Sequence, residues 1–170
     1  IKVSPQKLGS EDMDQLLLEL LGEEKLNQYI QTGDLDSSIG LEGLSRLRIN
    51  AYVANEKRCL TLRLLPNDLP KWQDLGLPNA FVELSKLHRG LLLCTGPTGS
   101  GKSTTLAAFI NCMLETQQRH ILTIEDPIEF IFKHTENSII HHREVKRDTN
   151  SFSVALRAAL REDPDVILSL

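Results

Sequence analysis

Apolar residues recur at helical spacing near the start of this chain of 170 residues. Leucines three and four positions apart predict a first helix, which begins at Ser10 as its expected N-cap and ends at Gly22. A second helix is expected from about Glu23 to Gly33. Glycine suits both ends because it readily adopts the left-handed backbone conformation that stops a helix.

The spacing of apolar residues then changes from helical to alternating. Every second residue from Leu47 to Val53 is apolar, which predicts a strand over Ser45–Val53 with one buried face. The polar run Asn55–Arg58 predicts a turn, and Cys59–Leu65 is the returning strand of a hairpin. Ile1–Val3 is a candidate for a further strand. Helices followed by strands predict an α+β unit.

The rest of the chain alternates helical segments with short apolar ones. Predicted helices cover Lys71–Leu75, Asn79–Leu87, Lys102–Glu115 and Ser151–Arg161, and predicted strands cover Leu91–Cys94, Ile121–Ile124, Ser138–His142 and Val166–Leu168. This alternation predicts an α/β fold, with a parallel sheet and helices on both of its faces. Prolines break the pattern over Pro66–Pro70. We therefore divide the chain into a domain over residues 1–66, a linker over 67–75 and a second domain over 76–170.

A glycine-rich turn separates the first predicted strand of the second domain from the helix after it. The pattern G-x-x-x-x-G-K-[ST] is matched at every required position, and a threonine follows it: Gly96, Pro97, Thr98, Gly99, Ser100, Gly101, Lys102, Ser103 and Thr104. Glycines allow successive backbone N–H groups to face an anion, and the helix N-terminus adds partial positive charge. Lys102 would reach the β- and γ-phosphates, and the Ser103 hydroxyl would bind Mg²⁺. The sequence therefore predicts a nucleoside triphosphate site.

Composition narrows the classes of partner. The net charge of −4 and the pI near 5.7 argue against a nucleic-acid-binding protein. No apolar run approaches the roughly 18 residues that a membrane span needs, so we expect no direct insertion into a membrane. The three cysteines show no C-x-x-C spacing and are expected to be reduced thiols of a cytosolic protein: Cys59, Cys94 and Cys112.

Three acids, Glu125, Asp126 and Glu129, come directly after the predicted strand Ile121–Ile124. Ligands of parallel sheets bind beyond the carboxyl ends of the strands, so these carboxylates can face the same crevice as the glycine-rich turn. There they would bind Mg²⁺ or polarise the water that attacks the γ-phosphate. A solvated acidic turn explains the same residues equally well. Pro127 favours a rigid turn because it fixes its own φ and restricts Asp126.

Arginines and histidines on predicted strands are the remaining candidates. Arg48 and Arg63 lie on the two strands of the hairpin, where an arginine ordinarily faces water. If the hairpin leans over a neighbouring subunit's glycine-rich turn, the same residues become arginine fingers for phosphoryl transfer. His141 and His142 are adjacent on one strand, so their rings point to opposite faces and cannot bind one metal ion together.

Four stretches together resemble the type II/IV secretion ATPase superfamily. They are Gly96–Ala108, His120–Phe130, Arg143–Val145 and Ala155–Asp165. The resemblance covers residues 34–168, and within the superfamily the chain is most similar to the ATPases that retract type IV pili. It implies a partial PAS-like domain in residues 1–66, followed by a RecA-like P-loop ATPase domain.

The resemblance assigns roles to individual residues. It implies ATP and Mg²⁺ as cofactors, with the Walker A motif at residues 96–103 and an acidic motif, the Asp box, at residues 123–130. Glu125 and Glu129 become candidate catalytic residues with Lys102, and Asp126 joins Ser103 as a candidate metal ligand. The hairpin arginines match family arginines that reach a nucleotide held in a ring of subunits.

The resemblance also implies a setting for the protein. It predicts a homo-hexameric motor in the cytoplasm, at the inner face of the cytoplasmic membrane, which works with pilus inner-membrane platform proteins and powers pilus retraction. A pilus-assembly or type II secretion ATPase and a non-hydrolysing nucleotide-binding module are the alternatives. Family members continue after the strand of residues 165–168 with a Gly-Glu pair that supplies the Walker B acid, where Ser169–Leu170 stands here. We therefore expect a C-terminally truncated fragment that binds nucleotide better than it hydrolyses it.

Overall fold

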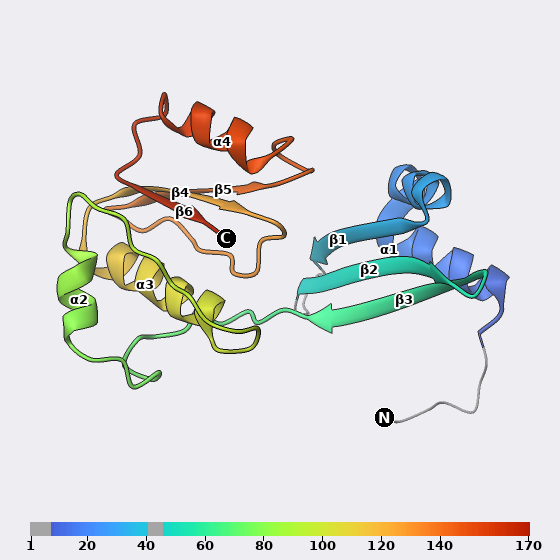
Figure 1. Cartoon of the computed structure of the whole chain (residues 1–170), viewed down its shortest axis with the longest axis horizontal. Helices are drawn as coiled ribbons and strands as arrows, with labels where there is room; N and C mark the ends of the chain where they lie inside the picture. The colour runs from blue at the N-terminus through green and yellow to red at the C-terminus, as the bar shows by residue number, and fades with distance from the viewer. Residues whose placement is uncertain (1–7, 41–45) are drawn as a thin grey trace. The chain divides into compact units, whose positions relative to one another are not determined.

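The computed structural model describes residues 8–40 and 46–170, so the predicted strand Ile1–Val3 and the predicted strand start at Ser45 lie outside the described residues. The chain divides into two compact units, Ile1–Leu65 and Pro66–Leu170. The helices and strands of each unit are labelled in Figure 1.

The first unit combines one long helix with an antiparallel sheet. Its elements are α1 (Ser10–Thr32), β1 (Asp34–Gly40), β2 (Arg46–Ala54) and β3 (Lys57–Leu64), and the strand order is β1-β2-β3. Gly22 has non-helical angles (φ 77°, ψ 169°), so α1 consists of two helical runs, as the sequence predicts. The N-cap is Gly9 rather than Ser10, because the Asp12 carboxylate accepts a hydrogen bond from the Gly9 N–H at 2.8 Å.

The core of the first unit follows the predicted alternation along β2. Leu47, Ile49 and Ala51 are buried against leucines of α1, whereas Val53 is 51% exposed. The expected buried face therefore ends at Ala51. Strand β1 was not predicted, because its sequence is mostly polar. Pairing with β2 along its whole length holds this segment in an extended conformation.

The second unit is a parallel sheet covered by helices, which confirms the predicted α/β class. Its elements are α2 (Ala80–Ser85), α3 (Lys102–Thr116), β4 (His120–Glu125), β5 (Ile139–Glu144), α4 (Phe152–Ala159) and β6 (Val166–Ser169). The strand order is β5-β4-β6, and both pairings are parallel. In Figure 1, α2 and α3 lie on one side of this sheet and α4 on the other.

Successive residues of β4 belong to two different cores. Ile121 packs with Phe109 and Met113 of α3, whereas Leu122 and Ile124 pack with alanines of α4. Because side chains of a strand alternate between its faces, one central strand holds helices against both sides of the sheet.

Two segments differ from the expected elements. Leu91–Cys94 is not a strand: Leu91 is 84% and Leu93 71% exposed, and no described strand pairs with this segment. An apolar run is buried as a strand only when neighbouring strands are there to pair with it. Lys71–Leu75 forms hydrogen-bonded turns instead of a helix, as in the bond from the Asp74 N–H to the Lys71 carbonyl.

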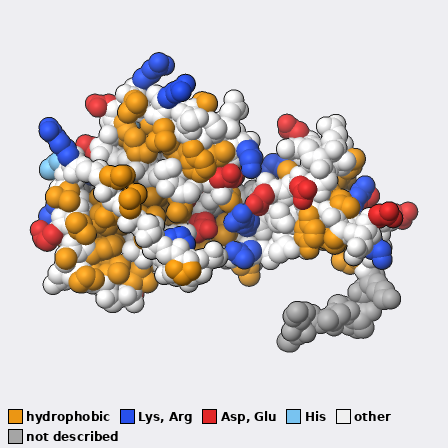
Figure 2. All heavy atoms as spheres, in the orientation of Figure 1, with side chains coloured by type: hydrophobic (Ala, Val, Ile, Leu, Met, Phe, Trp, Pro, Cys, Tyr) orange, Lys and Arg blue, Asp and Glu red, His pale blue; other side chains and the backbone are white. Residues whose placement is uncertain are grey.

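Apolar side chains remain on the surface of the second unit. Figure 2 shows hydrophobic side chains over much of its visible face. Leu69 and Trp72, in the segment expected to be a linker, pack against the core around α3. Within residues 8–40 and 46–170, no helix combines the length and the apolar character that crossing a membrane requires.

Candidate nucleotide-binding site

The glycine-rich turn is exposed and immediately precedes α3. Three of its glycines have positive φ: Gly96 at 155°, Gly99 at 79° and Gly101 at 87°. Gly101 is the N-cap of α3, and its carbonyl accepts the Thr105 N–H at 2.8 Å. A Cβ on Gly96 would lie 2.7 Å from Ser100 Oγ, and its φ is one that other residues rarely adopt, so a side chain at the start of the turn would be strained. The turn therefore has the tight curvature that a phosphate-binding loop needs.

The ammonium group of Lys102 is hydrogen-bonded within this turn. Its Nζ donates to the carbonyls of Gly96 at 3.0 Å and Pro97 at 2.9 Å. The side chain thus folds back over the loop, where an incoming phosphate would meet it. Ser103 and Thr104 are half-buried in the first turn of α3, and their predicted roles stay predictions.

The acidic turn, residues 125–130, begins at the last residue of β4, and its three carboxylates differ in environment. Glu125 is 2% exposed, Asp126 is exposed and Glu129 is half-buried. The Asp126–Pro127 peptide bond is cis. Asp126 pairs with Lys146 Nζ at 3.5 Å, and Glu125 Oε2 accepts the Glu129 N–H at 3.4 Å. The three acids therefore share one turn, but only Asp126 faces solvent openly.

Side chains of β5 hold the acidic turn, a role that was not predicted for them from the sequence. Glu144 is 6% exposed, and its Oε2 accepts the Ile128 N–H and an Arg147 N–H, each at 3.2 Å. The Nδ1 atom of His142 lies 3.9 Å from Glu125 Oε1. The parallel register places Glu144 beside Glu125 and His142 beside Thr123. Helical and strand periodicity could not reveal this support, because it depends on which two strands are neighbours.

Arg147 and Asp148 support the acidic turn indirectly, through their hydrogen bonds to Glu144. Asp148 accepts hydrogen bonds from Arg147 and, at 2.8 Å, from the Glu144 N–H. The hydrogen bond from the Arg147 guanidinium holds the pKa of Asp148 below its usual range. This pair therefore fixes the end of β5 that carries Glu144.

Arg48 and Arg63 occupy directly opposed positions on β2 and β3 in the first unit. Arg48 makes a two-pronged ion pair with Asp36, at 2.6 Å and 3.2 Å, and Arg63 is exposed. Both lie on the face of the sheet away from Ile49 and the core. Their predicted action on a nucleotide stays a prediction.

The adjacent histidines diverge as expected. His141 contacts His120 across the strands, with Nδ1 and Nε2 3.2 Å apart, whereas His142 contacts Thr123 and Phe132. No cluster of three or more His, Cys, Asp or Glu side chains suited to a metal ion occurs within the described residues.

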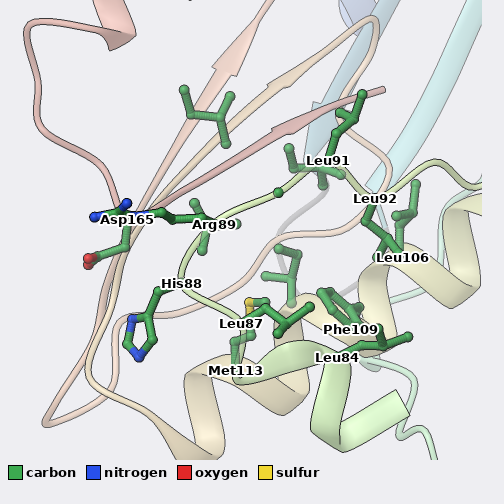
Figure 3. A pocket seen from close by; sticks show the side chains of 15 residues that line it. Leu84, Leu87, His88, Arg89, Leu91, Leu92, Leu106, Phe109, Met113 and Asp165 are labelled. Carbon is green, nitrogen blue, oxygen red and sulfur yellow. The ribbon is translucent and has the colours of Figure 1, made fainter. Parts of the chain in front are cut away.

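A cavity of about 290 Å³ lies apart from both turns. Figure 3 shows Leu91 and Leu92 on one side of it and Leu106, Phe109 and Met113 of α3 on another. Residues of β6 complete its lining. Its walls are mainly leucine and other apolar side chains, so it does not suit a triphosphate.

A helix that begins at a phosphate loop and covers one face of a parallel sheet is the architecture of P-loop nucleotide-binding proteins of the RecA-like class. The family described as "Type II/IV secretion system protein" matches residues 28–169, and the chain belongs to this family. It is 40% identical over 167 residues to the type IV pilus retraction ATPase PilT of Pseudomonas aeruginosa, covering 98% of this chain and 48% of that protein.

Two further similarities are close. The chain is 46% identical over 144 residues to a putative type II secretion system protein E of Escherichia coli, covering 81% of this chain and 28% of that protein. The crystal structure of the pilus retraction motor PilT with bound ADP matches with a TM-score of 0.89 and 46% identity, over 94% of this chain and 46% of that one. The chain thus spans about half the length of the PilT proteins that it matches.

Proposed function

We propose that this chain is part of an ATP-hydrolysing motor that retracts type IV pili. The observation that carries the proposal is the phosphate loop, which is complete from Gly96 to Ser103 and curved by three glycines with positive φ. The similarity to PilT in sequence and in fold supports the retraction class. In this function, the Lys102 ammonium donates to phosphate oxygens when ATP binds, in place of the Gly96 and Pro97 carbonyls.

The remaining site residues divide the chemistry between them. The Ser103 hydroxyl and the Asp126 carboxylate offer the oxygen ligands that Mg²⁺ prefers, and the ion would neutralise charge on the phosphates. Glu125 and Glu129 polarise the attacking water. Arg48 and Arg63 stabilise the transferring phosphoryl group from a neighbouring subunit of a homo-hexamer. We assign their unit to a PAS-like domain, and the motor to the cytoplasmic side of the membrane, with pilus platform proteins as partners.

The proposal is tested by measuring ATP binding and steady-state hydrolysis with and without Mg²⁺. Both this chain and the full-length protein should bind ATP, and the full-length protein should hydrolyse it in the presence of Mg²⁺. Binding without turnover in the full-length protein would contradict the motor and support the non-hydrolysing nucleotide-binding module.

A secretion or pilus-assembly ATPase is the second candidate, favoured by the 46% identity to a putative type II secretion protein E. The full-length gene should restore twitching to a retraction-deficient strain if the retraction proposal is right. Restored protein secretion in a secretion-deficient strain, without restored twitching, would favour the second candidate.

A further inference from the structure

The carboxylate of Glu125 is buried with little to orient it. The residue is 2% exposed, and its Oε1 has no hydrogen-bond partner among the described residues. Its Oε2 has only the long contact with the Glu129 N–H, at 3.4 Å. A buried charged group without good hydrogen bonds is costly, so a further group is expected to stabilise this carboxylate.

His142 is the neighbour that can do so. Its Nδ1 lies 3.9 Å from Glu125 Oε1, beyond hydrogen-bond distance but close enough for the dipole of an imidazole N–H to act on a buried carboxylate. The side chains are 14% and 3% exposed, so water screens this interaction weakly. His142 comes from β5 and Glu125 from β4, so the contact depends on the parallel pairing of the two strands.

The imidazole ring of His142 is held firmly on both sides. Nδ1 is 2.9 Å from Thr123 Oγ1, and Nε2 lies 3.2 Å from the Phe132 nitrogen and 3.3 Å from the Phe132 oxygen. The ring also stacks on Phe132, with centroids 5.7 Å apart and planes 9° from parallel. The position of Nδ1 is therefore fixed by the fold, independently of Glu125.

Two neutral tautomers fit these contacts. In one, Nε2 accepts the Phe132 N–H and Nδ1–H donates to Thr123 Oγ1, so that the positive end of this N–H also lies near Glu125. In the other, Nε2–H donates to the Phe132 oxygen, and the Nδ1 lone pair accepts the Thr123 hydroxyl and lies near the carboxylate. Because a lone pair and a carboxylate repel each other, Glu125 favours the first tautomer.

We propose that His142 is a positioning residue: the dipole of its Nδ1–H, which is hydrogen-bonded to Thr123, attracts the Glu125 carboxylate and orients it for its role on the attacking water. In this role His142 acts through Glu125, and no direct contact with nucleotide or water is assigned to it. The kinetic consequence rests on the function proposed above, whereas the tautomer does not depend on it. His141 is a natural control, because it is the same residue type on the opposite face of β5.

The tautomer is tested by ¹⁵N NMR of the imidazole rings in this chain without nucleotide. His142 should show a protonated Nδ1 and an unprotonated Nε2. Glu125→Gln should reduce the population of this tautomer, because the neutral amide no longer favours an N–H, and the His141 signals should not change. The proposal would be overturned by a protonated Nε2 in the unmodified chain. It would also be overturned if the tautomer population of His142 were the same in Glu125→Gln.

The kinetic role is tested in the full-length protein. His142→Leu should lower kcat by about tenfold, since small misplacements of a catalytic group are costly, while KM for ATP stays unchanged. His142→Asn should stay within about threefold of the unmodified enzyme, because its amide lies as many bonds from Cα as Nδ1 does. His141→Leu should behave like the unmodified enzyme.

Three kinetic outcomes would count against these proposals. An unchanged kcat for His142→Leu would overturn the positioning role. So would an equal loss in His142→Asn and His142→Leu with unchanged melting temperatures. No turnover in any form of the full-length protein would contradict the proposed function, and the NMR result would still decide the tautomer.

Discussion

The phosphate loop and the acidic turn are constructed in opposite ways. The loop at residues 96–103 is exposed, and backbone conformation together with its own lysine defines its shape. The acidic turn is largely buried, and side chains from β5 hold it in place. We therefore expect the loop to change its hydrogen bonds without loss of fold, and the turn to depend on its contacts with β5. Substitutions in the loop should affect ligand binding, and substitutions around the turn should affect stability.

The largest expected effect is on the loop. Lys102→Ala should weaken ATP binding by at least about a hundredfold, because it removes charge-assisted hydrogen bonds to phosphate. The melting temperature should not change. A fluorescent ATP analogue and circular dichroism measure the two properties. Lys86→Ala removes an exposed lysine that pairs with Glu83 and should bind ATP normally; undiminished binding by Lys102→Ala would mean that nucleotide binds elsewhere.

The converse experiment is Glu144→Ala beneath the acidic turn. It removes the acceptor for the Ile128 N–H and for Arg147, and should cost about 1–3 kcal/mol of the free energy of unfolding. Chemical denaturation measures the loss, with the exposed Glu136→Ala as the control. If Glu144→Ala is as stable as the unmodified chain, the proposed support of the turn is wrong.

A subtler change to the loop is Gly96→Ala. The added Cβ would meet Ser100 Oγ at 2.7 Å, and φ of 155° is unfavourable for alanine. We expect ATP affinity to fall by about tenfold, as for a cost of 1–2 kcal/mol at a strained position, with little change in melting temperature. Gly40→Ala, where a Cβ meets no atom, is the control. Normal affinity in Gly96→Ala would show that the loop relaxes freely.

The smallest effect concerns acid stability near the acidic turn. The pKa of Asp148 is lowered in the folded chain by its hydrogen bond from Arg147, so the ionised carboxylate stabilises the fold above the ordinary pKa of aspartate, about 4. This contribution is lost as the pH falls through the lowered pKa. Asp148→Asn should therefore lower the melting temperature slightly at pH 7, and this loss should shrink as the pH is lowered below about 4. The exposed Asp68→Asn should show no such dependence, and a pH-independent loss for Asp148→Asn would contradict the ion pair.

Local chemistry explains which features the sequence could predict. The phosphate loop, α3 and β4 depend on neighbouring residues, so glycine positions and periodicity were sufficient to predict them. Strand β1 was missed because pairing with β2 orders a polar segment. Leu91–Cys94 was wrongly predicted as a strand because its composition reports hydrophobicity and not the presence of a partner strand.

The residues of the candidate site also differ in how far they could be predicted from neighbouring residues in the sequence. The acids were predicted as a group from their position after an apolar strand. The supporting roles of His142 and Glu144 were not, because they arise from the register of β4 with β5. That register is set by packing of both sheet faces, which no single segment encodes.

The alternating burial of β4 has an evolutionary consequence. Ile121 belongs to the core beneath α3, and Leu122 and Ile124 belong to the core beneath α4. Inserting or deleting one residue within His120–Glu125 would exchange the two faces and disrupt both cores together. Homologous sequences should therefore differ within β4 by substitution, whereas insertions and deletions should be confined to the loops that flank it.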